Sequence, residues 1–556
     1  MDIVYVAYNS EKWIDKCFTS LLSSQIDLKE INVYVVDNNS SDNTVQALHN
    51  VKHKLGNSLG KFEIVESNKN FGFGKGNNLG FSKGNSDIVC FFNIDTEVLP
   101  DTLLNLQQAI NTSEDNVAMW ELRQFPYEHP KLYDAISQES LWCSGAAFAI
   151  KRKVFQQLNG FDTKIFMYSE DVDLSWRLRS FGYKIQYVPK SVIMHYSYEK
   201  AGVVKPNQHV FGVINNLMLR YRFGSRRDIL KGHMMFWSLM GIPSAFPHSK
   251  RMLLKEYIKH FGKIAHFRNS KAIGHDKHFL PTFVGWDYSG IRDGGYYSNE
   301  FPLEYPKVSI IVRTCGRPAV LRETLISLRN QTYPNLEIVV VEDGKDCAGE
   351  MIKKEFSDLN IKYFATGEKA GRSKAGNLAM EKATGKYLNF LDDDDLFYAD
   401  HVEVLVSNLV KGNNKAAYTF AFETPIEVFS KEPYKYSIKN YLGTHKQPFD
   451  KVMLCHHNYI PIQAIMFEKS LFEQYGGLDE SLDALEDWDL WVRYSMYTDF
   501  TCIPKTTSIY RTPANKANNA ERQKALDEAL TVVRNKHKGY IQKISVYDIA
   551  MLYQRL

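Results

Sequence analysis

The sequence predicts an α/β protein made of two tandem domains, each with a mostly parallel β-sheet covered by helices. The chain has 556 residues, more than one hydrophobic core normally supports. Short β-branched runs that end in Asp, Asn or Gly alternate with helical patterns, as in strand–helix–strand units. One series of such blocks also occurs twice in the same order, which indicates two copies of one architecture.

The repeat is clearest around an acidic strand end. The segment NLGFSKGNSDIVCFFNIDTEVL from Asn78 corresponds to NLAMEKATGKYLNFLDDDDLFY from Asn377, and the same offset relates Asp95 to Asp394. Further pairs of blocks are INVYVVDNNSSD with LEIVVVEDGKD, AFAIKRKVFQQLNGFD with AIMFEKSLFEQYGGLD, and SEDVDLSWRLRSFGY with LEDWDLWVRYSMYTD. We therefore expect domains at 1–215 and 305–515, a helical or linker region at 216–304, and a helical tail at 516–556. Within the middle region, residues 281–307 are rich in Gly, Pro and Tyr and are interpreted as a linker or docking segment.

Composition excludes some functional classes. The formal net charge is only +4, and neither zinc-finger spacing nor a basic stripe interleaved with aromatic residues occurs, so nucleic-acid binding is not expected. The seven cysteines form no CxxC pair, which is typical of a reducing cytoplasm. The start of the chain is strand-like and carries no secretory signal pattern, so we expect a cytoplasmic protein.

The most apolar stretch, Met234 to Phe246, is too short to cross a bilayer. Basic residues flank it, so it suits either a helix lying on the inner face of the cytoplasmic membrane or a core helix with charged ends.

Four consecutive aspartates, Asp392 to Asp395, follow the apolar strand YLNFL. Like charges at such spacing repel one another, so the cluster needs either full solvation or a neutralising cation. The carboxyl end of a strand is where open α/β sheets bind ligands, and alternate residues such as Asp392 and Asp394 point the same way. A divalent cation completed by a diphosphate would suit this place. The first copy has Asn93, Ile94 and Asp95 here, so we expect its metal site to be weaker.

Other polar residues recur at strand ends and in loops. Asp343 and Asn38 could accept a hydrogen bond from a pyrimidine base, although an Asx turn would also explain them. Lys75 and Lys374 stand in loops that precede helices and could contact a phosphate, but neither loop fits a P-loop motif.

An acidic pair opens one helix in each copy. These pairs are Glu170–Asp171 and Glu486–Asp487, and the helix dipole alone would stabilise acidic residues there. Their recurrence in the same order relative to the aspartate strand ends favours a general base instead. His195, after another strand, is either an extra metal ligand or a packed histidine.

Together these residues resemble the family 2 glycosyltransferases of the GT-A fold. The first half, with VVDNNSSD, NFGFGKGNNLG, NIDTEVLPD and FMYSEDVDLSWRLRSFGY, is similar to bacterial rhamnosyltransferase-type members. The second half, with SIIVRTCGRP, VVVEDGKD, FLDDDDLF and ALEDWDLW, looks like a general member. The resemblance implies two tandem GT-A domains, nucleoside-diphosphate sugar donors, a divalent metal (manganese or magnesium) and inversion at the anomeric carbon.

The resemblance also implies roles for individual residues. Asp171 and Asp487 would be catalytic bases, and Asp95, His195 and Asp394 would be metal ligands. The donor would be bound by Asp37, Asn38, Lys75, Asn93, Asp95, Thr314, Asp343, Lys374, Asp392 and Asp393. Two departures affect the metal geometry: Asn93 replaces the first aspartate of the metal triplet, and no histidine follows the last strand of the second domain.

We therefore expect a bifunctional transferase that extends a bacterial cell-surface polysaccharide on a saccharide or lipid-linked saccharide acceptor. The first domain would use dTDP-rhamnose and the second a UDP-sugar. The alternative is a single active domain, with the other serving as an acceptor-binding or docking module. A nucleotidyltransferase is disfavoured because neither copy contains a GxGTR-like loop.

Overall fold

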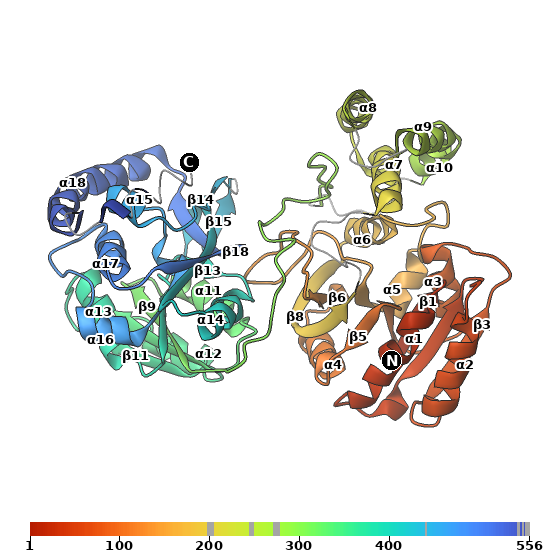
Figure 1. The fold of residues 1–556 in the computed structure, drawn as a ribbon, viewed down its shortest axis with the longest axis horizontal. Coiled ribbons are helices and arrows are strands. Elements are labelled where there is room, and N and C mark those ends of the chain that lie inside the picture. Colours follow the sequence, from red (N-terminus) through yellow and green to blue (C-terminus); the bar gives the residue numbers. More distant parts are fainter. Residues whose placement is uncertain are drawn as a thin grey trace. The chain divides into compact units, whose positions relative to one another are not determined.

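A computed structural model describes residues 1–196, 205–243, 249–270, 279–439, 442–541, 545–547 and 550. The chain forms two compact units, Met1–Asn299 and Glu300–Leu556. Each unit contains one mixed sheet with helices on both faces (Figure 1).

The sheet of the first unit has the strand order β3-β2-β1-β4-β7-β6-β8-β5. Strands β3, β2, β1 and β4 are parallel to one another, whereas β7 runs antiparallel between β4 and β6. The strands are β1 (Asp2–Ala7), β2 (Asn32–Asp37), β3 (Lys61–Glu66), β4 (Ile88–Asn93), β5 (Thr96–Val98), β6 (Val117–Phe125), β7 (Ala147–Lys151) and β8 (Lys184–His195). The helices that cover them are α1 (Glu11–Ser20), α2 (Thr44–Leu55), α3 (Phe73–Phe81), α4 (Thr102–Thr112), α5 (Arg152–Gln157) and α6 (Glu170–Ser180).

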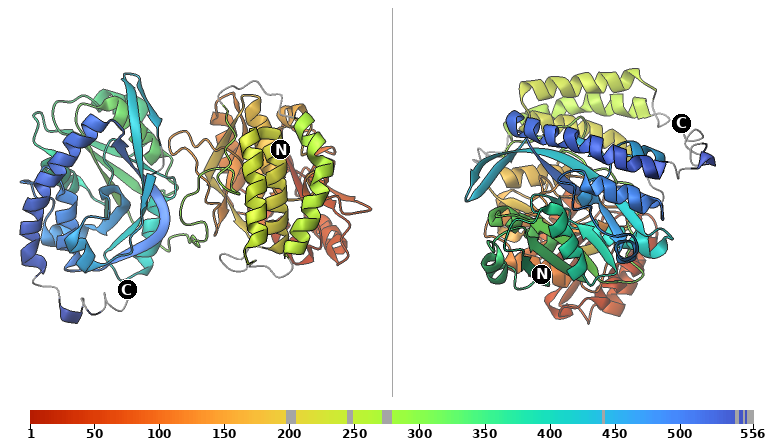
Figure 2. Two further views of the ribbon diagram at one scale, coloured as in Figure 1. Left: turned by 90° about the horizontal axis from the view of Figure 1, so that it is seen from above. Right: turned by 90° about the vertical axis from the view of Figure 1, so that its left-hand side faces the viewer.

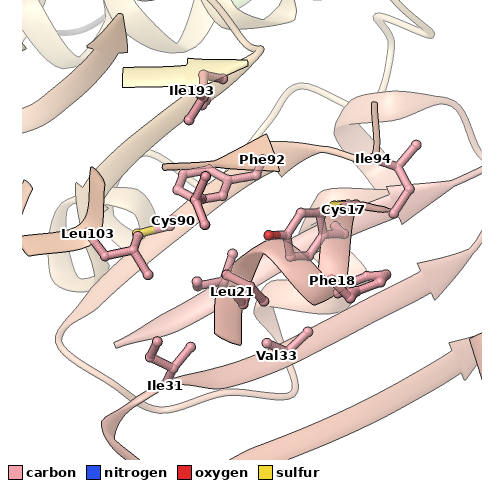
Figure 3. Close-up of a cluster of buried hydrophobic side chains, with 14 of the residues drawn as sticks. Cys17, Phe18, Leu21, Ile31, Val33, Cys90, Phe92, Ile94, Leu103 and Ile193 are labelled. Carbon is pink, nitrogen blue, oxygen red and sulfur yellow. The ribbon is translucent and has the colours of Figure 1, made fainter. Parts of the chain in front are cut away.

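Alternation along the strands divides the apolar side chains between the two faces of this sheet. Ile3, Tyr5 and Ala7 of β1 join one buried cluster, which Figure 3 shows around Phe18, Leu21 and Phe92. Val4 points the other way, into a cluster with residues of α5 and α6. The strand run at the start of the chain is therefore buried on both faces, as expected for a central parallel strand.

The second unit repeats this architecture. Its main sheet has the order β11-β10-β9-β12-β17-β14-β18-β13, which matches the first sheet strand for strand, and β15 and β16 add to β14. Its strands are β9 (Val308–Thr314), β10 (Leu336–Glu342), β11 (Ile361–Ala365), β12 (Tyr387–Phe390), β13 (Leu396–Phe397), β14 (Ala416–Lys431), β15 (Tyr434–Ile438), β16 (Leu442–His445), β17 (Ile465–Glu468) and β18 (Phe500–Pro513). Its helices are α11 (Pro318–Arg329), α12 (Gly349–Glu355), α13 (Arg372–Lys382), α14 (His401–Lys411), α15 (Lys451–His456), α16 (Lys469–Tyr475) and α17 (Glu486–Ser495). The predicted pair of α/β domains is confirmed.

Helices beyond the repeat pack on each unit. In the first unit these are α7 (Pro206–Phe223), α8 (Arg226–Gly241), α9 (Ser249–His260) and α10 (Ile264–Asn269). The second unit carries α18 (Lys516–Ile541), which contacts α15 and α17. The boundary between the units falls after Asn299, so α7 to α10 and the segment up to Asn299 belong to the first unit. No helix in the described part of the chain is long and apolar enough to cross a membrane.

In both units an added helix is tied to the sheet domain by a buried aspartate. Asp173 of α6 is fully buried and pairs with Arg177 at 2.8 Å and with Arg222 of α7. The corresponding Asp489 of α17 is also fully buried and pairs with Arg493 at 2.9 Å and with Lys536 of α18 at 2.9 Å. Arg222 and Lys536 each bind a second aspartate as well, Asp162 at 2.5 Å and Asp479 at 2.6 Å respectively.

Replacing Arg222 by Met should lower the free energy of unfolding of the first unit by about 3 to 5 kcal/mol, because it leaves the buried Asp173 carboxylate short of a partner. Hydrogen exchange of the α6 amides would measure the loss. The matched control is Arg226→Met on the exposed side of α8. A change in Arg222→Met no larger than in the control would contradict this account.

Candidate active sites

A cavity of about 500 Å³ opens at the carboxyl edge of the first sheet. Five residues singled out from the sequence line it together: Asn93, Asp95, Glu170, Asp171 and His195. They come from the end of β4, the turn before β5, the first turn of α6 and the end of β8. The topology therefore gathers at one place side chains that lie up to a hundred residues apart.

Asp95 and His195 face each other in this cavity. His195 Nε2 lies 3.5 Å from Asp95 Oδ1, and its Nδ1 is 2.8 Å from Gln124 Oε1. The strand pairing that puts Thr96 opposite His195 fixes this proximity. Burial raises the pKa of Asp95, but the hydrogen bond and charge of His195 lower it more, so the net pKa is below its ordinary value. The pair thus presents an ionised carboxylate beside an imidazole.

Asp171 occupies the first turn of α6. Its Oδ2 accepts from the Gly145 N–H at 2.8 Å and its Oδ1 from the Val172 N–H at 2.8 Å, which fixes the orientation of the carboxylate. Burial raises the pKa of Asp171, and the N–H donors and Lys131 offset only part of the rise. The chain enters the helix through Ser169 in a left-handed conformation with φ of 66°, a turn that the sequence did not indicate.

Residues expected at the nucleotide organise a loop beside this cavity. Asn38 Oδ1 accepts from the Phe71 N–H at 2.8 Å, and its Nδ2 donates to the Gly72 carbonyl at 3.1 Å. Asp37 accepts from the Ser40 N–H at 3.2 Å, and Lys75 Nζ lies 4.3 Å from the Phe71 ring centroid. Among the described residues, these three do not line the cavity. The loop that they hold leads directly into Phe73, which does line it.

Part of residues 281–307, which the sequence indicated as a linker or docking segment, forms one wall of the cavity. Trp286, Tyr288 and Ser289 line it together with Trp142. Tyr288 Oη lies 2.7 Å from Ser169 Oγ, and Trp142 Nε1 donates to Ser289 Oγ at 3.3 Å. Sequence reasoning missed these residues, because the only signal was the local abundance of aromatic residues and glycine.

In the second unit, arginine side chains pair with three of the four aspartates. Arg313, which is buried, makes a two-pronged contact with Asp392 at 2.7 Å for each pair of atoms, and its third nitrogen donates to Glu486 at 2.9 Å. Burial would raise the pKa of Asp392, but the charge and hydrogen bonds of Arg313 bring it below the ordinary value. Arg313 therefore joins the end of β9, the aspartate cluster and the start of α17.

The other three aspartates of the cluster also have hydrogen-bond partners. Arg317 binds Asp393 and also donates to Asp394 Oδ2 at 3.1 Å, while Thr314 Oγ1 donates to Asp393 at 2.7 Å. Burial, together with repulsion by Asp394 and Asp392, raises the pKa of Asp393 to about 7 despite these partners. Asp395 accepts from the Arg511 N–H at 2.9 Å. Sequence reasoning assigned the neutralisation to a metal and overlooked the two arginines in SIIVRTCGRP.

Asp487 repeats the arrangement of Asp171. Its Oδ1 accepts from the Trp488 N–H at 2.8 Å and its Oδ2 from Asn458 Nδ2 at 3.0 Å. The residue two positions earlier, Leu485, is left-handed with φ of 60°. Burial and the neighbouring Glu486 charge raise the pKa of Asp487 to about 6, although the Asn458 and Trp488 donors lower it.

Asp343 repeats the loop contacts of Asn38. It accepts from the Ala370 N–H at 2.5 Å and from the Gly371 N–H at 3.1 Å, just before α13. Lys374, one turn into that helix, is exposed.

The two departures from the family pattern have structural counterparts. Strand pairing puts Val6 beside Asn93 in the first unit. In the second unit Ile311 pairs with Phe390, and two residues further along these two chain segments come Arg313 and Asp392. The charged pair Arg313–Asp392 therefore occupies the place of the neutral pair Val6–Asn93. The second departure concerns the histidine. In the first unit Thr96 of β5 pairs with His195 of β8, and the corresponding register of β13 with β18 puts Tyr510 at the place of His195.

The donor set for a divalent cation differs between the units. In the described part of the chain no three His, Cys, Asp or Glu side chains are grouped to hold a metal. Asp95 and His195 fit manganese or magnesium if diphosphate oxygens complete the shell. Asp394 is partly exposed but shares its carboxylate with Arg317, so an ion there would have to displace a guanidinium.

Comparisons with known proteins identify the family of the chain. The family described as "Glycosyl transferase family 2" matches residues 2–174 and 309–471, which together make up more than half of the chain. The chain belongs to glycosyl transferase family 2. A related family, "Glycosyltransferase like family 2", matches residues 132–220. The predicted family 2 glycosyltransferase with tandem domains is thereby confirmed.

Similar proteins cover parts of the chain. An uncharacterized glycosyltransferase of Rickettsia typhi is 29% identical over 252 residues, which are 44% of this chain and 75% of that protein. One of Rickettsia bellii is 31% identical over 208 residues, 36% of this chain and 30% of that protein. Glycosyltransferase GlyA of Streptococcus pneumoniae is 39% identical over 106 residues, 19% of this chain and 15% of that protein.

Two solved structures are similar at lower identity. The mannosyltransferase PcManGT of Pyrobaculum calidifontis, solved with GDP-Man and Mn²⁺, is 18% identical with a TM-score of 0.32 and covers 49% of this chain and 72% of that one. Residues 1–349 of S. aureus TarS with UDP-GlcNAc are 14% identical with a TM-score of 0.32, covering 52% of this chain and 99% of that one.

Replacing Arg313 by Val should destabilise the second unit by about 3 to 5 kcal/mol, because Asp392 and Glu486 lose their shared cation. The double variant Arg313→Val with Asp392→Asn copies the Val6–Asn93 pair of the first unit and should recover part of that loss. Denaturant unfolding of the three proteins would measure both effects. A double variant less stable than Arg313→Val alone would contradict the proposed charge pairing.

Proposed function

We propose that the chain is a bifunctional inverting glycosyltransferase with one transfer site in each domain. The observation that carries this proposal is the repeated carboxylate at the start of α6 and α17. Asp171 and Asp487 each accept the N–H of the following residue and one further donor, and each follows a left-handed turn. A structural acid at a helix start would not need the same fixed orientation twice.

Each base would act on an acceptor hydroxyl. Asp171 or Asp487 takes the hydroxyl proton while the oxygen bonds to the anomeric carbon, and the bond from that carbon to the diphosphate breaks on the opposite face. The configuration at carbon therefore inverts. The raised pKa values make both carboxylates better proton acceptors than an exposed aspartate.

The donor would lie between the base and the loops described above. Asn38 and Asp343 would face the nucleotide base, with Asp37 and Thr314 beside them. Lys75 and Lys374 would contact the diphosphate, and Asn93, Asp392 and Asp393 the ribose or sugar. A manganese or magnesium ion held by Asp95 and His195, or by Asp394, would supply positive charge to the diphosphate. In the second unit Arg313 and Arg317, which pair with aspartates of the cluster, would also lie near the diphosphate.

The first cavity also suits a saccharide acceptor. Trp142, Trp286 and Tyr288 offer apolar ring faces with polar edges near Asp171, a combination that matches a sugar ring. We propose dTDP-rhamnose as the first donor, a UDP-sugar as the second, and a bacterial cell-surface polysaccharide as the product. All seven cysteines are free, which supports work in the reducing cytoplasm.

The proposal is tested by nucleotide release from UDP-, dTDP- and GDP-sugars with manganese or magnesium. Asp171→Asn and Asp487→Asn should each abolish the use of one donor, with a fall in kcat of about 10² to 10⁴. Asp115→Asn and Asp483→Asn, both exposed, are the matched controls and should leave both activities unchanged. One donor consumed, with one of the two variants fully active, would show that the other domain is a binding or docking module.

The second activity should also fall as the pH drops through about 6, because Asp487 must be deprotonated to act as a base. Two variants should move this limb of the kcat/KM profile in opposite directions. Asn458→Ala removes a hydrogen bond to the carboxylate and should shift the limb to higher pH. Glu486→Gln removes a like charge and should shift it to lower pH. Shifts in the same direction would rule out Asp487 as the titrating group.

A further inference from the structure

Helices α8 and α9 form an outer layer on α7 in the first unit. Both pack beside α7 (Figure 2). They meet each other through the rings of Phe236 and Tyr257, which stack with centroids 4.0 Å apart. Gly232, Phe236, Leu253 and Tyr257 make up the buried side of this layer. The short 3₁₀ helix η3 (Phe261–Lys263) continues α9.

The opposite side of the layer is apolar and exposed. On α8 the exposed side chains are Leu230 (62%), Met234 (62%) and Trp237 (54%), spaced by four and three residues so that they form one stripe. A second stripe with the same spacing follows α9 and η3 and consists of Leu254, Ile258 and Phe261, with Ile258 63% exposed. We call these six side chains the outer face.

The outer face includes part of the apolar stretch from Met234 to Phe246. The sequence allowed two interpretations of this stretch, a core helix or a helix on a membrane surface. Met234 and Trp237 belong to that stretch and are exposed, whereas Phe236 between them is buried. Residues 244–246 of the stretch lie outside the described part of the chain. The described part is therefore amphipathic, with a second apolar side that α7 and α9 do not cover.

Basic side chains surround the outer face. Residues 226–263 contain eight Lys or Arg and two acidic residues. The exposed basic residues are Arg226, Arg227, Lys231, Arg251, Lys255 and Lys259. Both acidic residues have partners, since Asp228 caps α8 through Ser225 and Glu256 pairs with Lys259 at 2.6 Å. The surface around the apolar stripes is thus strongly positive.

We propose that the outer face docks on a lipid bilayer that carries anionic headgroups. The apolar stripes would enter the boundary between headgroups and acyl chains, and the basic residues would contact the headgroup phosphates. Two exposed apolar stripes flanked by positive charge match this surface in both chemistry and sign. Because the first residues of α7 line the cavity, docking would also hold that cavity close to the membrane. Use of a lipid-linked acceptor there rests on the proposed function, but the docking does not.

The test is co-sedimentation of the full chain with phosphatidylcholine vesicles, with and without phosphatidylglycerol. We expect binding to the anionic vesicles only, weakened by salt. The triple variant Leu230→Ser, Met234→Ser, Ile258→Ser should bind at least about tenfold more weakly, because three side chains no longer enter the bilayer. The matched control, Leu280→Ser, Leu303→Ser, Phe429→Ser, removes three equally exposed apolar side chains elsewhere and should bind like the parent.

Trp237 provides an independent readout. Its emission should shift to the blue on anionic vesicles, and Trp237→Phe should remove that shift. Lys231→Glu with Lys255→Glu should remove the preference for anionic vesicles. Absence of binding at low salt, or equal binding by the two triple variants, would overturn the proposal. The proposal would also be overturned if the protein self-associated and only the outer-face triple variant abolished this self-association, because a second copy of the chain would then cover the outer face. None of these measurements depends on transferase activity.

Discussion

The structure depends on keeping buried carboxylates in balance with cations. Acidic side chains gather at the carboxyl edge of both sheets, where burial makes an unpaired charge costly. The second unit meets this cost with Arg313 and Arg317, which hold three aspartates and Glu486. The first unit meets it by having fewer charges at the strand end, where Asn93 lies beside Val6 and the single carboxylate, Asp95, lies beside His195. The same strand geometry thus supports two different electrostatic solutions.

A second charge balance involves buried aspartates of α6 and α17. Asp173 and Asp489, two residues after the proposed bases, are fully buried, and each needs a cation from outside the repeated blocks. The first receives Arg222 from α7 and the second Lys536 from α18. These helices have no evident sequence similarity, yet each supplies a positive charge at the same place. The added helices therefore help to orient α6 and α17.

The sequence was sufficient to predict what is repeated. The strand ends, the acidic pairs and the tandem α/β domains followed from blocks that recur in order, because recurrence separates a constrained residue from an incidental one. Features that occur once were not predictable in this way. Arg313 has no counterpart in the first unit, and Trp286 and Tyr288 lie in a segment without secondary structure. Their roles depend on contacts across long stretches of chain, which local patterns do not encode.

The segment that contains Trp286 and Tyr288 and ends at Asn299 is the last part of the first unit, and it also forms a wall of the cavity. This bears on how such a chain could be reshuffled during evolution. A recombination breakpoint near residue 215 would keep the whole sheet but remove Trp286, Tyr288 and Arg222, the partner of Asp173. A breakpoint after Asn299 would transfer the cavity intact. The segment that must be inherited as one piece to keep the cavity is therefore longer than the repeated blocks. It also includes the added helices and the residues up to Asn299.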